Sequence, residues 1–517
     1  MNHLVIAPIV LPLLAGVLLV FMTSAPLASR RAANLIATTA LLLLGIGLLW
    51  LSADGAHRVY ELGDWPAPFG IVLVLDRLSA FMVCLTGIVA LASLLFAVQG
   101  WDGRGKNFHP LFQLQLLGLN IAFLTGDAFN LFVAFEVMLI ASYGLLLHGG
   151  GRARTRAGFH YVVINLIGSS LFLLGVGLLY AVTGTLNMAD LAVQAAVVSP
   201  EDAFLLKAGG LLLMLVFAVK AALLPLYFWL PGAYSAASAP VAAIFAIMTK
   251  VGAYAIIRVS VLVFGPQAGE AADLLAPYLL PVALATHVAG MVGALAADTL
   301  RRQVAYLVVA SMGTLLAAVG LYSGEGLDAA LYYLPHGTLV ICALFMLADL
   351  VGMQRGELDD RLQAGRALAQ PALLGVLYFA LAIAVIGLPP LSGFIGKVLI
   401  MNAALDSSAL AWVWAVLLGG GLLGIIGMGR AGSQIFWKSG DVEAAADTPR
   451  VGLGHALPVA AVLTLLAALT VLAGPFGELT AATAAQVMDT GAYVDAVLGT
   501  PGALEARELL SAGENAR

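Results

Sequence analysis

The chain has 517 residues, of which 62% are hydrophobic and only 10% charged, and its formal net charge is −5. A soluble domain carries about a quarter charged residues, so this composition excludes a soluble protein. The apolar runs have the length of helices rather than the alternation of barrel strands, which predicts an all-α polytopic membrane protein. Its two cysteines, Cys84 and Cys342, lie apart, and no glycine-rich nucleotide motif follows a strand, so we expect no cofactor and no metal.

In chain order, the hydrophobic runs predict about fourteen transmembrane helices. They fall near residues 4–22, 33–51, 72–98, 111–126, 128–148, 158–182, 204–230, 238–264, 273–296, 302–322, 327–351, 371–402, 408–437 and 455–473. The first lacks a basic flank and a clear cleavage site, so we expect a span rather than a signal peptide. Residues 57–76, with turn residues between β-branched flanks, predict a small hairpin at the surface.

Lysine and arginine are concentrated in the loops that follow odd-numbered spans, at positions 30–31, 104–106, 152–156, 301–302, 355–366 and 430–450. The positive-inside rule then places these loops in the cytoplasm and both termini on the outer face of the cell's inner (plasma) membrane. The tail after Gly474 is polar and acidic, with an amphipathic patch at Tyr493–Val497. We expect it to pack on the surface rather than form a separate domain.

The seventh and eighth predicted spans each carry a lysine near the middle, Lys220 and Lys250, and the seventh is interrupted by Pro225. A charge at the centre of a membrane is costly, and broken backbone is tolerated only where protein buries it or water reaches it. A lysine beside such a break is therefore typical of an ion path. The alternative is that proline is simply common in membrane helices and that both lysines reach the surface. That alternative suits Lys250 poorly, because a long uncharged stretch precedes it.

The twelfth span, within residues 384–401, repeats this pattern with Pro389, Pro390 and then Lys397. Broken helices five spans apart predict two inverted five-helix repeats, spans 4–8 and spans 9–13, with discontinuous helices 7 and 12. The expected division is a three-span region at 1–110, a first repeat at 111–264, a second repeat at 265–438, and a last span with its tail at 439–517.

Glu136 stands alone near the centre of the fifth span, and its natural partner is Lys220 in the same repeat. Pairing would favour the charged form of both groups, and separation would release the lysine's proton, which makes a two-state switch. The alternative is a static buried salt bridge, which would leave Lys250 and Lys397 unexplained.

His336, in the eleventh span, titrates near neutral pH and could link Lys250 to Lys397, although a structural histidine fits the sequence about as well. His287 in the ninth span is a weaker candidate. Asp127 is expected to cap a helix.

Two further charged residues, Arg258 and Asp349, lie near the ends of the eighth and eleventh spans. Both are expected to be anchors at the membrane interface.

At these residues the sequence resembles the D-type member of the Mrp-type multisubunit monovalent cation/proton antiporters, relatives of the antiporter-like subunits of respiratory complex I. The stretches that carry the resemblance are FNLFVAFEVMLIASYGLLLHGG, YAVTGTLNMADLA, KAALLPLYFWLPGAYSAASAPVAAIFAIMTKVGAYAIIR and GLPPLSGFIGKVLI. The resemblance implies that Glu136, Lys220, Lys250 and Lys397 hold the family's carboxylate–lysine and relay positions. It also implies a hetero-oligomeric complex with several small membrane subunits and a larger homologous one.

In the tenth span the chain departs from this pattern. Leu307 to Val309 replace the small hydroxyl residues that the superfamily often has there, which puts a polar role for this span in doubt.

The sequence therefore predicts a secondary transporter subunit rather than an enzyme, one that moves protons in exchange for Na⁺ or K⁺ through Glu136, Lys220, Lys250, His336 and Lys397. The alternative is a proton-pumping subunit of respiratory complex I or a related redox complex. A scaffold with a vestigial path is disfavoured, because unused buried charges would be a liability. Expected partners are the other subunits, the lipid bilayer, protons and the cation, but no nucleic acid. The neighbouring reading frames would separate antiporter from redox complex.

Overall fold

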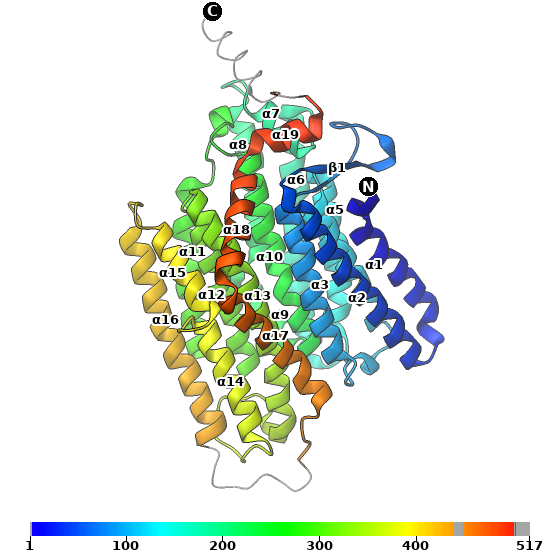
Figure 1. Cartoon of the computed structure of the whole chain (residues 1–517), viewed down its shortest axis with the longest axis vertical. Helices are drawn as coiled ribbons and strands as arrows, with labels where there is room; N and C mark the ends of the chain where they lie inside the picture. Colours follow the sequence, from blue (N-terminus) through cyan, green and yellow to red (C-terminus); the bar gives the residue numbers. More distant parts are fainter. Residues whose placement is uncertain (1–2, 439–447, 501, 503–517) are drawn as a thin grey trace, which may run out of the picture.

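The computed structural model describes residues 3–438, 448–500 and 502. In this part the chain is a bundle of long helices with a single two-stranded sheet (Figure 1). The helices α10 and α13 run through the centre. In each of them, all residues of the apolar 18-residue window are buried. The predicted all-α polytopic membrane fold is confirmed.

Twelve helical stretches of the described residues are long and apolar enough to cross a membrane. Their main helices are α1 (His3–Phe21), α2 (Leu27–Leu51), α3 (Arg77–Ala97), α5 (Ala128–Leu147), α6 (Arg152–Thr183), α8 (Ala203–Ala221), α10 (Ala239–Leu262), α11 (Ala276–Ala296), α12 (Leu300–Val319), α13 (Gly324–Arg355), α16 (Leu410–Gly432) and α17 (Leu453–Val471). Three apolar helices are shorter: α4 (Phe108–Leu124), α14 (Pro371–Ile386) and α15 (Ser392–Ala403). The expected spans, about fourteen, correspond to the twelve stretches, α4, and the pair α14–α15.

Two of the spans are interrupted at the expected places. The helix α8 ends before Ala222, which has a φ of 56° in the left-handed region, and the chain resumes as α9 (Trp229–Ala236). The helix α14 ends before Gly387, with a φ of 79°, and resumes as α15. Prolines stand inside both gaps, where their missing N–H groups cost no helical hydrogen bond. Discontinuous helices 7 and 12 are therefore confirmed, while the inverted relation of the two halves stays a prediction.

The predicted hairpin is also present. Strands β1 (Arg58–Glu61) and β2 (Val72–Leu75) pair antiparallel, with Arg58 opposite Leu75. It lies at the end of the bundle that also carries the short helix α7 (Met188–Ala195) (Figure 1).

The tail packs onto the bundle as expected. The helix α18 (Ala473–Met488) contacts α13, and α19 (Thr490–Leu498) contacts α7. Tyr493, Val494 and Val497 of the predicted amphipathic patch are buried. Residues 503–517, the charged end of the tail, lie outside the described residues.

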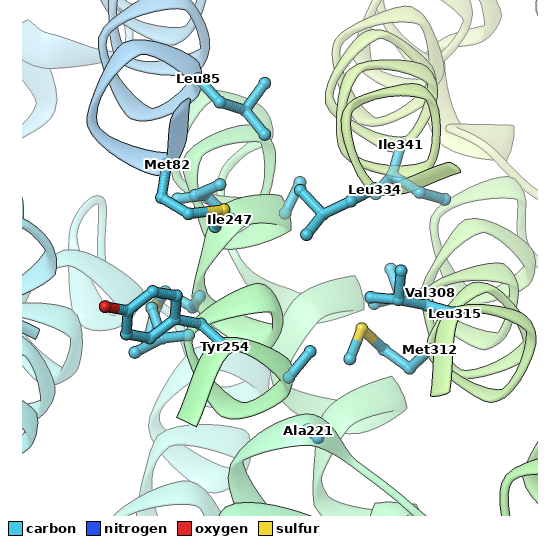
Figure 2. Packing of buried hydrophobic residues seen from close by; sticks show 14 of the residues in the cluster. Met82, Leu85, Ala221, Ile247, Tyr254, Val308, Met312, Leu315, Leu334 and Ile341 are labelled. Carbon is cyan, nitrogen blue, oxygen red and sulfur yellow. The ribbon is translucent and has the colours of Figure 1, made fainter. Parts of the chain in front are cut away.

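Apolar side chains from α3, α8, α10, α12 and α13 meet at the centre of the molecule. Figure 2 shows this packing, with Met82 of α3, Ile247 of α10, Met312 of α12 and Leu334 of α13 among the buried residues. Between helices in lipid, such packing acts through close van der Waals contact rather than through removal of water. Polar and charged groups in this interior therefore stand out as costly exceptions.

The expectation that Arg258 is an interfacial anchor is wrong. Its Nη2 donates a 2.5 Å hydrogen bond to Oδ2 of Asp76, and the two residues are only 5% and 1% exposed. The ring of Tyr493 on α19 lies 5.3 Å from the guanidinium, so the folded-back tail covers a charge that the sequence places near a helix end. Asp127 does cap α5 as expected, with its Oδ1 accepting from the Asn130 N–H at 2.7 Å.

Asp349 is likewise buried rather than anchored at the interface. It accepts hydrogen bonds from Trp101 Nε1 at 2.8 Å and from Arg301 Nη2 at 3.0 Å. The loop that precedes α4 folds back beneath the end of α13 and supplies the tryptophan, a contact that no sequence-local pattern indicates.

A polar cluster around the buried Asp102 links α2 to the start of α4. Arg31 of α2 donates two hydrogen bonds to Asp102, at 2.6 and 2.8 Å, and His109 Nε2 lies 3.2 Å from the same carboxylate. Burial alone would raise the pKa of Asp102, but the hydrogen bonds from His109 and Arg31 outweigh it and hold the pKa at about 2. Asp102 therefore stays charged at any ordinary pH.

Candidate functional site

The first part of the site lies between α5, α6 and α8. Glu136, near the middle of α5, is half-buried, and its carboxylate accepts a short hydrogen bond from the Ser169 hydroxyl of α6. Its neighbours on the same helix face, Val133 and Ile140, are exposed. Glu136 therefore lies at the lateral surface of the chain. Its isolation near the centre of an apolar span had instead indicated a position deep inside.

Lys220 lies in the last turn of α8, just before the break, and is buried. Its Nζ donates a 2.8 Å hydrogen bond to Oδ1 of Asn165 on α6 and lies 5.8 Å from the centre of the Phe135 ring. The Asn165 amide is itself fixed by donating to the Tyr161 carbonyl at 2.8 Å. The lysine thus has a polar neutral partner at membrane depth.

Glu136 and Lys220 do not form the direct ion pair that the sequence predicts. No such pair occurs between them among the described residues. Asn165 holds the lysine and Ser169, one turn later on α6, holds the carboxylate, so α6 separates the two charges while leaving them within electrostatic range. Sequence reasoning missed both α6 residues, although a polar pair at i, i+4 in an apolar helix could have indicated them.

Lys250 lies near the middle of α10 and is only 1% exposed. Its Nζ has no hydrogen-bond partner among the described residues. Two residues later, Gly252 packs directly on α8, where an added Cβ would lie 2.5 Å from the Ala221 backbone nitrogen. This close crossing brings the Lys250 turn of α10 against the Lys220 end of α8.

His336 joins the two halves of the site. It lies in the middle of α13, and its Nδ1 is 3.0 Å from the Ser392 hydroxyl at the start of α15. A Cβ added at Gly393 would lie 2.6 Å from its Nε2, so only glycine lets α15 approach the ring this closely. Lys250 and Lys397 are both within electrostatic range of the ring.

Lys397 lies on α15, beyond the second break, and is 6% exposed. Its Nζ donates a 2.6 Å hydrogen bond to the carbonyl of Ile386, the last residue of α14. That carbonyl is at the helix end, where backbone acceptors lack intrahelical partners and the helix dipole favours a cation. The interruption of the helix therefore creates the acceptor that holds the lysine.

The structure thus brings together all the residues that the sequence singled out, in the order Glu136, Lys220, Lys250, His336, Lys397. The first two lie around α6, Lys250 lies at the crossing of α8 and α10, and the last two lie around the second break. Every one except Glu136 is at most 6% exposed. Each is a titratable group that the apolar packing alone would not require.

Comparisons with known proteins identify the family of this chain. Residues 125–423 match the model of the family described as NADH:quinone oxidoreductase/Mrp antiporter, TM. The chain belongs to this family. Within it, the chain is 42% identical over 534 residues to the D subunit of the probable K⁺/H⁺ antiporter of Rhizobium meliloti, covering 97% of this chain and 98% of that one. It is 37% identical to the D subunit of the Na⁺/H⁺ antiporter of Alkalihalophilus pseudofirmus, covering 96% of this chain and all of the other.

Solved structures of the family agree with this assignment. A chain of the Mrp complex from Dietzia sp. DQ12-45-1b is 29% identical, with a TM-score of 0.86 over 96% of this chain and 99% of that one. A chain of respiratory complex I from Thermus thermophilus is 25% identical, with a TM-score of 0.76 over 93% and 99%. The predicted membership among Mrp-type D subunits, with kinship to complex I, is confirmed.

The tenth span of this family member, α12, does carry polar groups in the interior. The Thr314 hydroxyl is hydrogen-bonded to His287 Nδ1 at 2.9 Å. Ser311 packs against Gly337, where a Cβ added to the glycine would lie 2.5 Å from the Ser311 Oγ. The tenth span therefore carries buried hydroxyl groups at Ser311 and Thr314, beyond the apolar positions Leu307 to Val309. His287 is fully buried, and its Nδ1 lies 3.1 Å from the Ala310 carbonyl oxygen and 2.9 Å from the Thr314 hydroxyl.

Proposed function

We propose that this chain is the proton-conducting D-type subunit of a multisubunit antiporter that exchanges protons for Na⁺ or K⁺. The observation that carries the proposal is the set of buried titratable side chains Lys220, Lys250, His336 and Lys397, which lie on the two broken helices and on the central helices α10 and α13. Ionisable groups inside membrane spans are costly and typically mark ion or proton pathways.

The chemistry follows from how each group is held. Lys220 and Lys397 have neutral acceptors, an amide oxygen and a backbone carbonyl, which bind an ammonium group without cancelling its charge. Lys250 has no acceptor among the described residues, so its charged state is the least stabilised of the three. A proton arriving at Lys220 would repel one on Lys250, and that one would move on toward His336 and Lys397. Water in the unwound segments would carry the proton between them.

Glu136 sets the starting state of this series. A carboxylate at Glu136 would attract an ammonium group at Lys220 across the α6 residues that separate them. Movement of Glu136 toward Lys220 would hold the proton there, and movement away would release it. Because Glu136 lies at the lateral surface, a neighbouring subunit is well placed to drive this movement.

The exchanged cation and the orientation belong to the same proposal. One relative is named for K⁺ and another for Na⁺, so both ions are candidates for this chain. We propose that the chain lies in the plasma membrane with both termini outside, because the arginine-rich loops follow the odd-numbered spans.

The test uses inverted vesicles from a host without its own antiporters, expressing the complete set of subunits with or without this chain. We expect addition of Na⁺ or K⁺ to dissipate an imposed pH gradient only when the chain is present. If the cation dissipates the pH gradient equally with and without the chain, the antiporter function is rejected. The competing function, a proton pump of a redox complex, is favoured instead if proton movement requires an electron donor and ignores the cation.

A further inference from the structure

A cavity of about 380 Å³ opens on the face of the bundle that carries the arginine-rich loops. Its lining comes from both halves of the chain: the loop before α4, the start of α6, the α9–α10 junction, the start of α12, and the end of α13. It lies apart from the buried lysine series and was not indicated by any motif in the sequence. Its volume is in the range of small-molecule sites and exceeds what a bare ion requires.

The lining of this cavity holds more arginines than carboxylates. Three arginines line it, Arg104, Arg154 and Arg301, against Asp349 and Asp359. Arg301 pairs with both aspartates, at 3.0 and 2.9 Å, and with Asp360 outside the lining at 3.6 Å. Within the described residues, neither Arg104 nor Arg154 forms an ion pair.

Both unpaired arginines are oriented by neutral groups. The Arg104 guanidinium carbon lies 3.7 Å from the centre of the Trp101 ring, and that of Arg154 lies 5.2 Å from it. The Trp101 ring is fixed by its hydrogen bond to Asp349, and Arg154 donates from Nε to the Ala236 carbonyl at 3.0 Å. Two forks of N–H donors, that of Arg104 exposed and that of Arg154 partly buried, are therefore held beside one ring without a carboxylate bound to either.

An unsatisfied hydroxyl lines the same cavity. Ser238, directly before α10, is 1% exposed, and its Oγ has no hydrogen-bond partner among the described residues. It does not cap its own helix either. A buried hydroxyl without a partner is costly, and this one lies at the positive end of a 24-residue helix.

We propose that this cavity binds a phosphate-bearing anion, with Arg104 and Arg154 as charged donors and Ser238 as the hydroxyl donor at the α10 N-terminus. Arginine forks suit phosphate oxygens, and helix N-termini favour anions. The phosphate of an anionic lipid headgroup and free inorganic phosphate share this chemistry. A basic pocket between helices beside the membrane surface is typical of a headgroup site. Occupancy would join the ends of α10 and α13, the helices that carry Lys250 and His336.

The test measures binding to the complete purified antiporter complex in a neutral detergent. One arm adds inorganic phosphate and the other adds short-chain phosphatidylglycerol, each against chloride and phosphatidylcholine at matched ionic strength. We expect at least one phosphate compound to bind and to raise the melting temperature, with affinity lower by about tenfold or more in Arg104→Gln. Arg152→Gln, an exposed arginine outside the cavity on the same helix as Arg154, should bind like the wild type.

A second variant separates loss of anion binding from loss of folding. Ser238→Ala removes an unpartnered hydroxyl, so without phosphate its melting temperature should equal or exceed that of the wild type, while its affinity for the anion falls. Protection by phosphatidylglycerol alone identifies a lipid headgroup, and protection by inorganic phosphate that competes with the lipid identifies a free anion. The proposal is overturned if neither compound binds, or if Arg104→Gln and Ser238→Ala bind as tightly as the wild type.

Discussion

Asn165 accepts a 2.8 Å hydrogen bond from the Nζ of Lys220, and through it the helix α6 stands between that lysine and Glu136. The carboxylate and the ammonium group are each bound to a neutral side chain of α6 rather than to each other. This geometry is one state of the proposed switch, the state in which the pair is separated. A direct contact would require either Glu136 or Lys220 to leave its α6 partner.

Asn165→Leu should therefore impair exchange, although the substitution changes no charged residue. The variant leaves the Lys220 ammonium without its acceptor, and a hydrogen bond to a charged group is worth about 1.5–3 kcal/mol. We expect exchange in inverted vesicles to fall by about tenfold or more. Ser170→Ala is the matched control, since Ser170 is exposed on the same helix and bonds only within it. Equal activity in both variants would remove Asn165 from the path.

Glu136→Ala should abolish cation-dependent proton movement while the complex still assembles, because Glu136 is half-buried and its loss leaves no cavity in the core. Assembly is followed by co-purification of the other subunits, and exchange by the decay of an imposed pH gradient. Glu270→Ala serves as the control, because that carboxylate forms a surface pair with Lys207 at 3.4 Å. Full exchange by Glu136→Ala in normally assembled complex would contradict the switch.

Lys250→Ala should strongly impair exchange, and Lys250→Arg should fail to restore it fully. Arginine keeps the charge but does not release its proton at accessible pH, so a relay through position 250 stops. The initial rate of exchange across a range of pH measures this directly. If arginine supports the wild-type rate, the charge is required at this position but its titration is not.

The buried Asp102 predicts a pH-dependent contribution to stability. Its pKa in the folded chain is about 2, below the usual 3.8, so its stabilising effect is complete above pH 3.8 and is lost as the pH falls toward 2. Asp102→Asn should therefore lower the melting temperature of the purified complex at neutral pH, and the difference from the wild type should shrink as the pH falls below about 4. Asp54→Asn, which changes an exposed pair with Arg58, should have little effect. A difference that does not change with pH would show that packing, not charge, is responsible.

The sequence predicted the spans, the two breaks and the five titratable residues because each leaves a strong local signal. A lysine in a long apolar run and prolines within a span are visible without any knowledge of packing. The partners of those residues could not be predicted in the same way. Asn165 and Ser169 are ordinary polar residues in a helix, and only the crossing of α6 with α5 and α8 gives them a role.

The buried states of Arg258 and Asp349 were missed for a related reason. Both lie near helix ends, where long polar side chains usually reach the membrane surface. Here the tail helix α19 and the loop with Trp101 fold over those ends, from positions far away in the chain. Contacts between distant segments decide whether a charge near a helix end is exposed, and a single sequence does not contain them.

If protons cross from the first broken helix to the second, the substitution Lys397→Ala should stop them. Exchange is measured in inverted vesicles, together with the side from which single cysteines placed near Lys250 and Lys397 can be labelled. Lys207→Ala, an exposed lysine on the helix that carries Lys220, is the control. We expect Lys397→Ala to block net exchange while labelling near Lys250 still occurs from the first half's side, and the two cysteines to be labelled from opposite sides. Full exchange in Lys397→Ala, or labelling of both positions from one side, would contradict a path through both halves.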